Sequence, residues 1–418
     1  MMKLTRRDYF ATLATSAAAV WLEPVCAVAR DTGPIRIKDV DLFRIEIPTP
    51  REDVGRGLMN TCLAARVDTD VGVRGYGFAE YLTVRMQPNA RLWEFNFDFP
   101  PSDYIRGVIR PALVGKDLFA IQDHLKAGLL EWGGVEHALW DAIGRIAGQP
   151  VYRLLGGSKH SIPVYLTYVW PGKEDQSDVP YQLQAEMAAR IQKAGFRAMK
   201  IRAWRARPLD DVEARAEIRA AVGPDFAIMF DRTAHISGQV WDYNTALLVA
   251  QGLEKHGAYW LEEPFARTDF FSPARLARDV DIPITGGESY QGLDPFRECL
   301  VHSTYDILQP DGIIAGGIFT VRKIAAMAEG FHTRVVMHGT MGLSLAGWLQ
   351  ANAALGGQWQ ELAIMYPPLL PEEQWSPALK ILKTPTLFTF RNGEIQVPQG
   401  PGLGLDVKEE AVEEFRVR

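Results

Sequence analysis

The pattern of apolar positions in the N-terminal part of the chain predicts strands followed by helices. Residues 35–48 alternate apolar and polar positions, which is the pattern of a β-strand with one buried face. Two further strands are predicted at 61–67 and 73–80, separated by a turn. From 103 to 149 the apolar positions follow a helical period instead, with Gly and Pro breaks. Strands followed by helices predict a small N-terminal α+β capping domain at residues 31–158.

From residue 159 onward, short apolar runs alternate with amphipathic stretches such as 181–194 and 243–256. The apolar runs are 162–168, 198–201, 227–230, 258–261, 282–285, 307–309, 334–337 and 361–365. Short strands buried on both faces favour parallel pairing. Eight strand–helix units predict an α/β fold with a TIM-like (β/α)7–8 barrel over residues 159–380. A doubly wound sheet is the alternative that fits the same pattern.

The tail, residues 381–418, does not continue the strand–helix alternation. It contains strand-like segments at 387–391 and 394–397 with Asn392-Gly393 between them, which is a hairpin signal. A tail with two strand-like segments does not fit the helix that would close the barrel. We therefore expect the tail to return to the capping domain.

The first thirty residues are predicted to be an export signal rather than part of the fold. Arg6-Arg7 precedes the apolar run Ala11–Leu22, and Ala27-Val28-Ala29 offers small residues for a signal peptidase. This order resembles a twin-arginine signal, which predicts a periplasmic or otherwise exported protein. A soluble amphipathic helix is the alternative. The apolar run is shorter than the roughly 20 residues that span a bilayer, so we expect no stable membrane association after the signal is removed.

Composition excludes several other classes of protein. The 418 residues are 47% hydrophobic and 23% charged, which rules out a disordered chain. The net charge is −6 and no basic stripe is present, so nucleic acid is not an expected partner. Cys26, Cys62 and Cys299 are too scattered for a zinc site or a disulfide framework.

Polar residues follow the predicted barrel strands at regular intervals. They are Lys200 and Arg202, Asp231, Glu262, Glu288, Asp311 and His338, and successive strand ends lie 23 to 31 residues apart. One strand–helix unit separates each pair, and the chemistry of such barrels sits at the carboxyl ends of their strands. These side chains are therefore predicted to converge on one face.

Three consecutive strand ends carry the carboxylates Asp231, Glu262 and Glu288. Unpaired carboxylates are unfavourable in a barrel mouth, and hard oxygen ligands suit Mg²⁺. Each residue alone has an ordinary explanation: Asp231 as a loop carboxylate, Glu262 as a helix start, Glu288 as an N-cap neighbour and His338 as a structural histidine. The regular spacing favours a shared site over independent coincidences.

At this point the sequence resembles the enolase superfamily, and within it the mandelate racemase group. The segment Trp132–Asp141, followed by Pro150 and Leu154–Gly157, is similar to the helix that leads into that family's barrel. The resemblance implies Mg²⁺ as cofactor, a small-molecule carboxylate as substrate and a homo-oligomeric assembly. It also implies roles for the matching residues: Asp231, Glu262 and Glu288 as metal ligands, His338 as base, Asp311 as its partner, and Glu361 as a hydrogen-bonding partner of the substrate carboxylate.

Two positions depart from the family pattern. Thr233 stands where the family commonly has asparagine, and Arg202 stands where the racemases have a second catalytic lysine. Arginine stays protonated in proteins, so it is a poor base, but its planar guanidinium can donate two hydrogen bonds to one carboxylate. A racemase that uses two bases is therefore disfavoured.

The expected chemistry is abstraction of the proton next to a carboxylate. Mg²⁺ would stabilise the developing enediolate, His338 would take the proton, and Lys200 would neutralise the substrate carboxylate. We expect syn dehydration of a sugar acid to a 2-keto-3-deoxy acid. The alternatives are a racemase or epimerase with Lys200 as second base, and a non-catalytic exported carboxylate-binding protein. Muconate-type cycloisomerisation is disfavoured, because that group lacks the His–Asp pair.

The identity of the acid is not encoded in these motifs. Specificity is expected in the capping-domain loops 49–60 and 80–99, the second of which is rich in aromatic residues. Trp170, just after the first barrel strand, is a further candidate.

Overall fold

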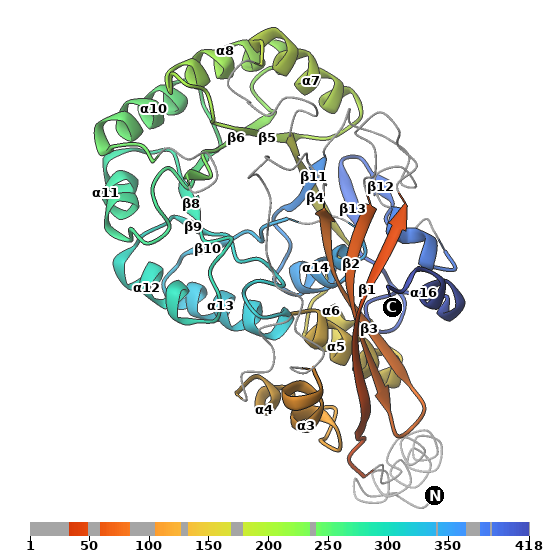
Figure 1. The fold of residues 1–418 in the computed structure, drawn as a ribbon. Helices are drawn as coiled ribbons and strands as arrows, with labels where there is room; N and C mark the ends of the chain where they lie inside the picture. Colours follow the sequence, from red (N-terminus) through yellow and green to blue (C-terminus); the bar gives the residue numbers. More distant parts are fainter. Residues whose placement is uncertain are drawn as a thin grey trace, which may run out of the picture.

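The computed structural model shows a barrel with a smaller domain on one side of it (Figure 1). It describes residues 33–48, 59–83, 105–126, 133–168, 179–234, 240–339, 342–364, 377–384 and 387–417. The predicted signal at 1–30, Trp170 and most of the two specificity loops lie outside the described residues. Within these ranges, no helix is long and apolar enough to cross a membrane.

The smaller domain contains a three-stranded antiparallel sheet in the order β1-β2-β3. Its strands are β1 (Ile37–Pro48), β2 (Met59–Thr69) and β3 (Arg74–Thr83). Its helices are α3 (Arg110–Leu113), α4 (Ile121–Lys126), α5 (Gly133–Ala147) and α6 (Val151–Leu154), with a helical turn at Ile105–Ile109 before them. The predicted alternation holds in β1, where Phe43 and Ile45 are buried and Arg44 between them is exposed.

Helix α5 covers one face of this sheet at very short range. A Cβ atom at Gly75 would lie 2.2 Å from the Ala138 carbonyl oxygen, and one at Gly77 would lie 1.9 Å from the Gly134 carbonyl oxygen. Glycine at these positions of β3 therefore allows the helix and the strand to pack backbone against backbone. On its other side, Glu136 of α5 accepts hydrogen bonds from the Ile318 and Phe319 N–H groups, which ties α5 to the barrel.

Within the described residues, eight parallel strands form the barrel, and a named helix follows each of the first seven. The strands are β4 (Ser161–Tyr168), β5 (Ala198–Arg202), β6 (Ala227–Asp231), β7 (Trp260–Glu262), β8 (Ile284–Gly286), β9 (Ile307–Leu308), β10 (Arg334–Val335) and β11 (Gln360–Ile364). The helices are α7 (Tyr181–Lys193), α8 (Asp210–Val222), α10 (Tyr243–Lys255), α11 (Phe271–Asp279), α12 (Asp294–His302), α13 (Ile318–Gly330) and α14 (Ser344–Ala354). Helices α7 to α13 form an arc around the strands in Figure 1. The predicted fold class is confirmed, and the doubly wound alternative is wrong, because β11 pairs with β4.

The barrel strands are buried on both sides, as their short apolar runs predicted. One layer of side chains fills the interior: Tyr165, Ala198, Met229, Trp260, Ile307 and Val336. Their neighbours in sequence, such as Met199 and Phe230, face the helices and belong to the main core. The interior is thus a packed core, and the carboxyl ends of the strands lie above it.

The C-terminal tail contacts both parts of the molecule. It contains a helical turn at Pro377–Ile381 and three further elements: β12 (Phe390–Arg391), β13 (Glu394–Gln396) and α16 (Glu409–Phe415). Strand β13 pairs antiparallel with the start of β4, so the predicted hairpin joins the barrel sheet. Further along, Glu409 accepts a hydrogen bond of 2.6 Å from the Tyr76 hydroxyl of the capping domain. The domain boundaries expected from the sequence, at residues 158 and 380, stay predictions.

Candidate active site

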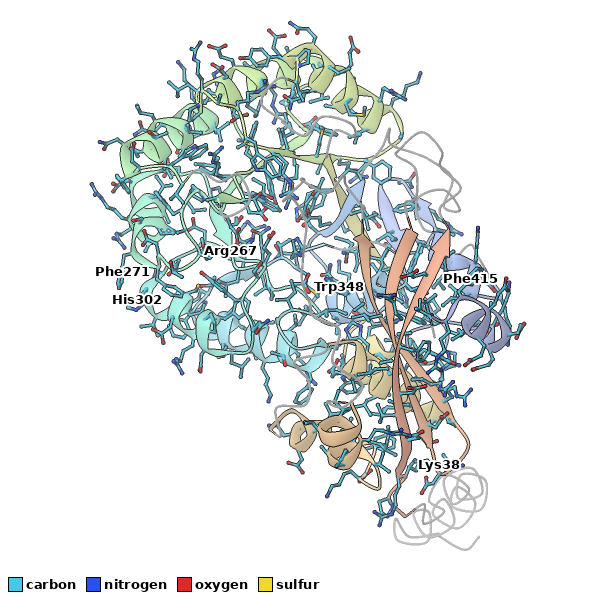
Figure 2. The ribbon with its side chains drawn as sticks, viewed as in Figure 1. Lys38, Arg267, Phe271, His302, Trp348 and Phe415 are labelled. Atoms are coloured by element: carbon cyan, nitrogen blue, oxygen red, sulfur yellow. The ribbon has the colours of Figure 1, made fainter. Side chains whose placement is uncertain are left out.

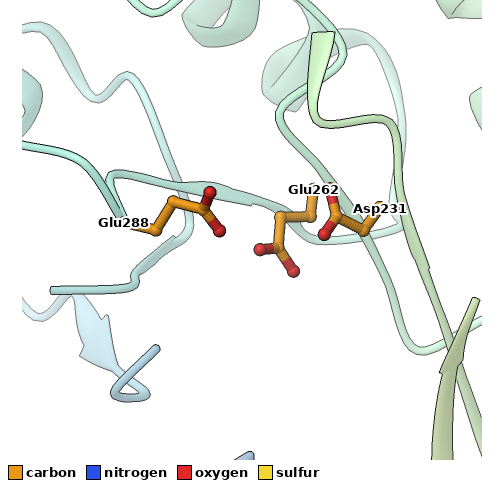
Figure 3. A group of neighbouring side chains, drawn as sticks. All are labelled: Asp231, Glu262 and Glu288. Carbon is orange, nitrogen blue, oxygen red and sulfur yellow. The ribbon is translucent and has the colours of Figure 1, made fainter. Parts of the chain in front are cut away.

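The strand register brings the predicted site residues together. Arg202 is the Cα partner of Asp231, and Asp231 is the Cα partner of Glu262, on the adjacent strands β5, β6 and β7. Glu288 follows the end of β8 by two residues. In the resulting group Glu262 lies between Asp231 and Glu288 (Figure 3). The three carboxylates are buried, and one oxygen of each lies within 4.8 Å of the others.

Lys200 lies at the centre of the negative charge. Its side chain is fully buried, and Nζ is 3.0 Å from Glu262 Oε2 and 3.4 Å from Asp231 Oδ2. A third carboxylate, Glu361, is 2.8 Å away through Oε1. Burial lowers the pKa of Lys200, but the charges of Glu262 and Glu361 outweigh burial and raise its pKa well above the ordinary value. Lys200 therefore holds its proton.

Asp231 has a partner at each oxygen. Arg202 Nη1 donates to Oδ2, and the Thr233 hydroxyl donates to Oδ1 at 2.6 Å. Arg202 also donates to Thr233 Oγ1 at 3.0 Å, so the three side chains form a closed hydrogen-bonded group. Thr233 adopts a left-handed backbone conformation, with φ of 43°, that is uncommon for a β-branched residue. The threonine that replaces the family's asparagine thus contacts the first carboxylate.

The pKa of Glu262 is raised by its buried position and by the neighbouring carboxylate. Burial raises the pKa of Glu262 to about 8, and the charge of Asp231 acts in the same direction. Besides Lys200, Glu262 accepts a hydrogen bond of 3.1 Å from Gln309 Nε2. Burial and the charge of Asp231 thus both favour the protonated form of Glu262, and the charge of Lys200 opposes them.

Glu288 is held by one oxygen only. Arg267 Nη2 lies 2.5 Å from its Oε1, and the same guanidinium contacts Glu263 at 2.8 Å. The other oxygen, Oε2, is buried and makes no hydrogen bond within the described residues, although His338 Nε2 lies 3.3 Å from it. Arg267 therefore orients Glu288 while leaving Oε2 available.

His338 and Asp311 form the predicted pair. His338 Nδ1 lies 2.8 Å from Asp311 Oδ2, and Asp311 Oδ1 accepts hydrogen bonds of 2.8 Å from the backbone N–H groups of Ile313 and Ile314. Burial lowers the pKa of His338, but the charge of Glu288 and the hydrogen bond to Asp311 outweigh it and raise the pKa to about 10. Asp311 fixes the ring so that Nε2 points toward the carboxylates.

Glu361 lies on β11 among hydrogen-bond donors. It accepts from the Tyr165 hydroxyl at 2.9 Å, from the Gly339 N–H at 3.0 Å, from the Thr167 hydroxyl and from Lys200. Burial raises the pKa of Glu361, but Lys200, His338 and the hydrogen bond from Thr167 together outweigh burial and lower the pKa to about 2. Glu361 is thus an ionised acceptor that fixes Lys200, and its contact with a substrate stays a prediction.

The arrangement fits a divalent cation. Three carboxylates from consecutive strands approach one another, one buried oxygen has no hydrogen bond, and the donor set consists of hard oxygens only. Mg²⁺ prefers such ligands and completes its coordination with water or substrate oxygens.

Several residues of the site were not assigned a role from the sequence. Gln309 precedes Asp311 by two residues, but its contact with Glu262 crosses the barrel interior, so the spacing along the sequence does not reveal it. Arg267 follows Glu262 by five residues in a loop. Tyr165 and Thr167 were identifiable in principle, because alternate positions of a barrel strand point inward and a threonine in an apolar strand needs a partner.

Comparisons with known proteins agree with this geometry. The family model described as enolase C-terminal domain-like matches residues 182–411. Arabinonate dehydratase of Saccharolobus solfataricus is 30% identical over 329 residues, which are 75% of this chain and 83% of that protein. D-galactarolactone cycloisomerase of Agrobacterium fabrum is 31% identical over 304 residues, which are 71% of this chain and 77% of that protein.

Among solved structures, the chain is similar to D-glucarate dehydratase from Agrobacterium tumefaciens complexed with magnesium. The TM-score is 0.75 and the sequence identity is 26%, over 92% of this chain and 100% of that chain. The similarity therefore extends over both the barrel and the smaller domain.

Proposed function

The chain belongs to the enolase superfamily, and from this premise we propose that it is a Mg²⁺-dependent dehydratase that converts a sugar acid to a 2-keto-3-deoxy acid. Two of the similar proteins are dehydratases of sugar acids by name, arabinonate and glucarate. The observation that carries the proposal is the single base. His338 faces the carboxylates from one side, whereas Lys200 and Arg202 on the other side are held as cations by their carboxylate partners.

Asp231, Glu262 and Glu288 are the proposed ligands of Mg²⁺. When bound, Mg²⁺ supplies positive charge that stabilises the substrate carboxylate as the α-proton leaves and offsets the Glu288 charge that otherwise holds a proton on His338. Arg267 keeps Glu288 in place through Oε1. Lys200 balances the remaining negative charge, since it contacts three carboxylates at once.

His338 carries out both proton transfers. Its neutral Nε2 takes the α-proton while Asp311 holds Nδ1–H and favours the imidazolium that forms. The imidazolium then returns this proton to the β-hydroxyl, which leaves as water from the same face of the substrate. The resulting enol takes up a proton at the β-carbon and becomes the 2-keto acid. One histidine is sufficient for this syn elimination.

A racemase needs a second base on the opposite face, and Lys200 is the only candidate that the sequence offered. Lys200 is fully buried and its ammonium group contacts three carboxylates, which favour its charged form. Arg202 is bound to Asp231 and Thr233 and is a poor base for intrinsic reasons. These contacts support dehydration over racemisation.

A screen of aldonic and aldaric acids with Mg²⁺, in which 2-keto acid formation is measured, tests the proposed function. We expect turnover of at least one acid and loss of turnover with EDTA. A protein that binds Mg²⁺ and sugar acids but releases no 2-keto acid and exchanges no α-proton would be the non-catalytic binding protein instead. Assembly into a homo-oligomer remains a prediction.

We further propose that residues 1–30 direct export, on the evidence of their sequence. Fusion of this segment to a folded reporter should place the reporter in the periplasm, and lysine at both Arg6 and Arg7 should keep it in the cytoplasm. Cell fractionation measures both outcomes. A reporter that stays in the cytoplasm with the intact segment would refute the localisation.

A further inference from the structure

The barrel has a seam at the strand that leads to His338. Ladder hydrogen bonds join β4 to β10 in order and join β4 to β11, but within the described residues none joins β10 to β11. Strand β10 ends at Val335, and His338 lies three residues beyond it. On the β9 side, His338 N–H donates to the Pro310 carbonyl at 3.1 Å. On the β11 side, no backbone hydrogen bond joins the described residues around His338 to that strand, and the Gly339 N–H donates to the Glu361 side chain instead, at 3.0 Å.

Within the residues that the structure describes, the His338 carbonyl is hydrogen-bonded by an indole and not by a neighbouring strand. Trp348 Nε1–H donates to the His338 carbonyl oxygen at 2.8 Å. Trp348 is a residue of α14 that is 3% exposed, and it lies between the barrel and the β1–β3 sheet (Figure 2). The same ring covers Gly312, where a Cβ atom would approach it to 3.0 Å. Because Gly312 directly follows Asp311, one side chain contacts the backbone at both members of the His338–Asp311 pair.

The capping domain in turn holds this indole. His137 of α5 is buried and meets the Trp348 ring edge to face, with ring centroids 5.8 Å apart and an interplanar angle of 89°. A Cβ atom at Gly347, the residue before the tryptophan, would lie 2.3 Å from the His137 ring. The helix that carries Trp348 can approach α5 this closely only because residue 347 is glycine. Trp348 is therefore clamped from the capping-domain side.

We propose that Trp348 is a positioning residue that fixes His338 against Asp311 by closing the β10–β11 seam. The proposal rests on the proposed role of His338 as the base. Without the indole N–H, the His338 carbonyl loses its partner, and the segment 334–339 keeps its bonds to β9, the bond from Gly339 to Glu361 and the contacts of Arg334, none of which reaches that carbonyl. A displacement of about 1 Å at a reacting group costs up to about 10²-fold in rate.

Trp348→Phe tests this, because it keeps an aromatic ring and removes the N–H donor together with one ring of the indole, a loss of volume that the control variant below shares. We expect kcat to fall at least about 10-fold with KM within about twofold, since the acid is still bound but the base is misplaced. Hydrogen–deuterium exchange of the peptide 334–339 should become faster, while the Mg²⁺ affinity stays at the wild-type value.

Trp359→Phe is the matched control. Trp359 donates its indole N–H to the Tyr259 hydroxyl at 3.2 Å at the amino ends of the strands, far from the proposed base. This variant should leave kcat and the exchange of 334–339 unchanged. Equal effects of the two variants, or an unchanged exchange rate in Trp348→Phe, would overturn the positioning role. A wild-type protein that is inactive on every acid would contradict the proposed function, and the exchange comparison would still decide the role of Trp348.

A second variant covers the case in which Trp348→Phe does not fold. Gly347→Ala places a methyl group against the His137 ring and should displace Trp348, with the same loss of kcat and faster exchange. His137→Ala in the same chain removes the clash and should bring both values part of the way back, because the ring that contacts Trp348 is removed with it. Wild-type exchange and kcat in Gly347→Ala would refute the clamp.

Discussion

Asp231→Asn, Glu262→Gln and Glu288→Gln should each abolish turnover and weaken Mg²⁺ binding while the barrel stays folded. Each substitution keeps the shape of the side chain and replaces one carboxylate oxygen by an NH₂ group, which cannot bind a cation, in a group whose oxygens lie within 4.8 Å of one another. Electrophilic stabilisation by a metal contributes several kcal/mol to such a reaction, which corresponds to a loss of about 10³-fold or more in kcat. Calorimetric titration with Mg²⁺ and the rate of 2-keto acid formation measure the two effects.

Asp306→Asn is the control for these variants. Asp306 accepts a hydrogen bond of 2.8 Å from the Ile284 N–H at the amino end of β8, so its substitution removes a carboxylate from the opposite end of the barrel. It should leave the Mg²⁺ dissociation constant unchanged. Wild-type Mg²⁺ affinity in any one of the three site variants would exclude that carboxylate as a ligand.

The positions of the site residues could be predicted because a barrel repeats. Each strand–helix unit returns the chain to the same face, so Asp231 and Glu262, 31 residues apart, become Cα partners on adjacent strands. The strand ends were predictable for the same reason, even though β9 and β10 are only two residues long. The repeat of strand–helix units is visible in the apolar pattern, so the strand ends could be predicted without knowledge of any side-chain contact.

Contacts that cross the barrel could not be predicted in this way. Gln309 reaches Glu262 through the interior, and Arg267 reaches Glu288 from a neighbouring loop, so neither contact follows from the repeat. The pairing of β13 with β4 was missed because a hairpin signal gives no partner strand. Trp348 belonged to an apolar helix in which a tryptophan has an ordinary role in the core; only the structure shows where its N–H is directed.

His338→Asn should eliminate both dehydration and exchange of the α-proton with solvent. Asparagine retains a polar side chain of similar reach but cannot accept the proton, and loss of a general base costs about 10²- to 10⁴-fold in rate. Dehydration is followed by 2-keto acid formation, and proton exchange by NMR in D₂O with both epimers of the substrate. His302→Asn, on the outer helix α12, replaces a half-buried histidine in the same way and should leave both rates unchanged.

The same experiment decides between one base and two. If Lys200 were a second base, His338→Asn would still exchange the α-proton of one epimer, and the wild-type enzyme would interconvert the epimers. Lys200 has three carboxylate partners and no exposed surface, so we expect no exchange with either epimer.

Arg202→Lys provides the converse test. It loses the planar fork that binds Asp231 and Thr233 and introduces a group with a lower intrinsic pKa. Dehydration should fall in that variant, and any epimerised substrate it forms would show that arginine at this position keeps the reaction on one face.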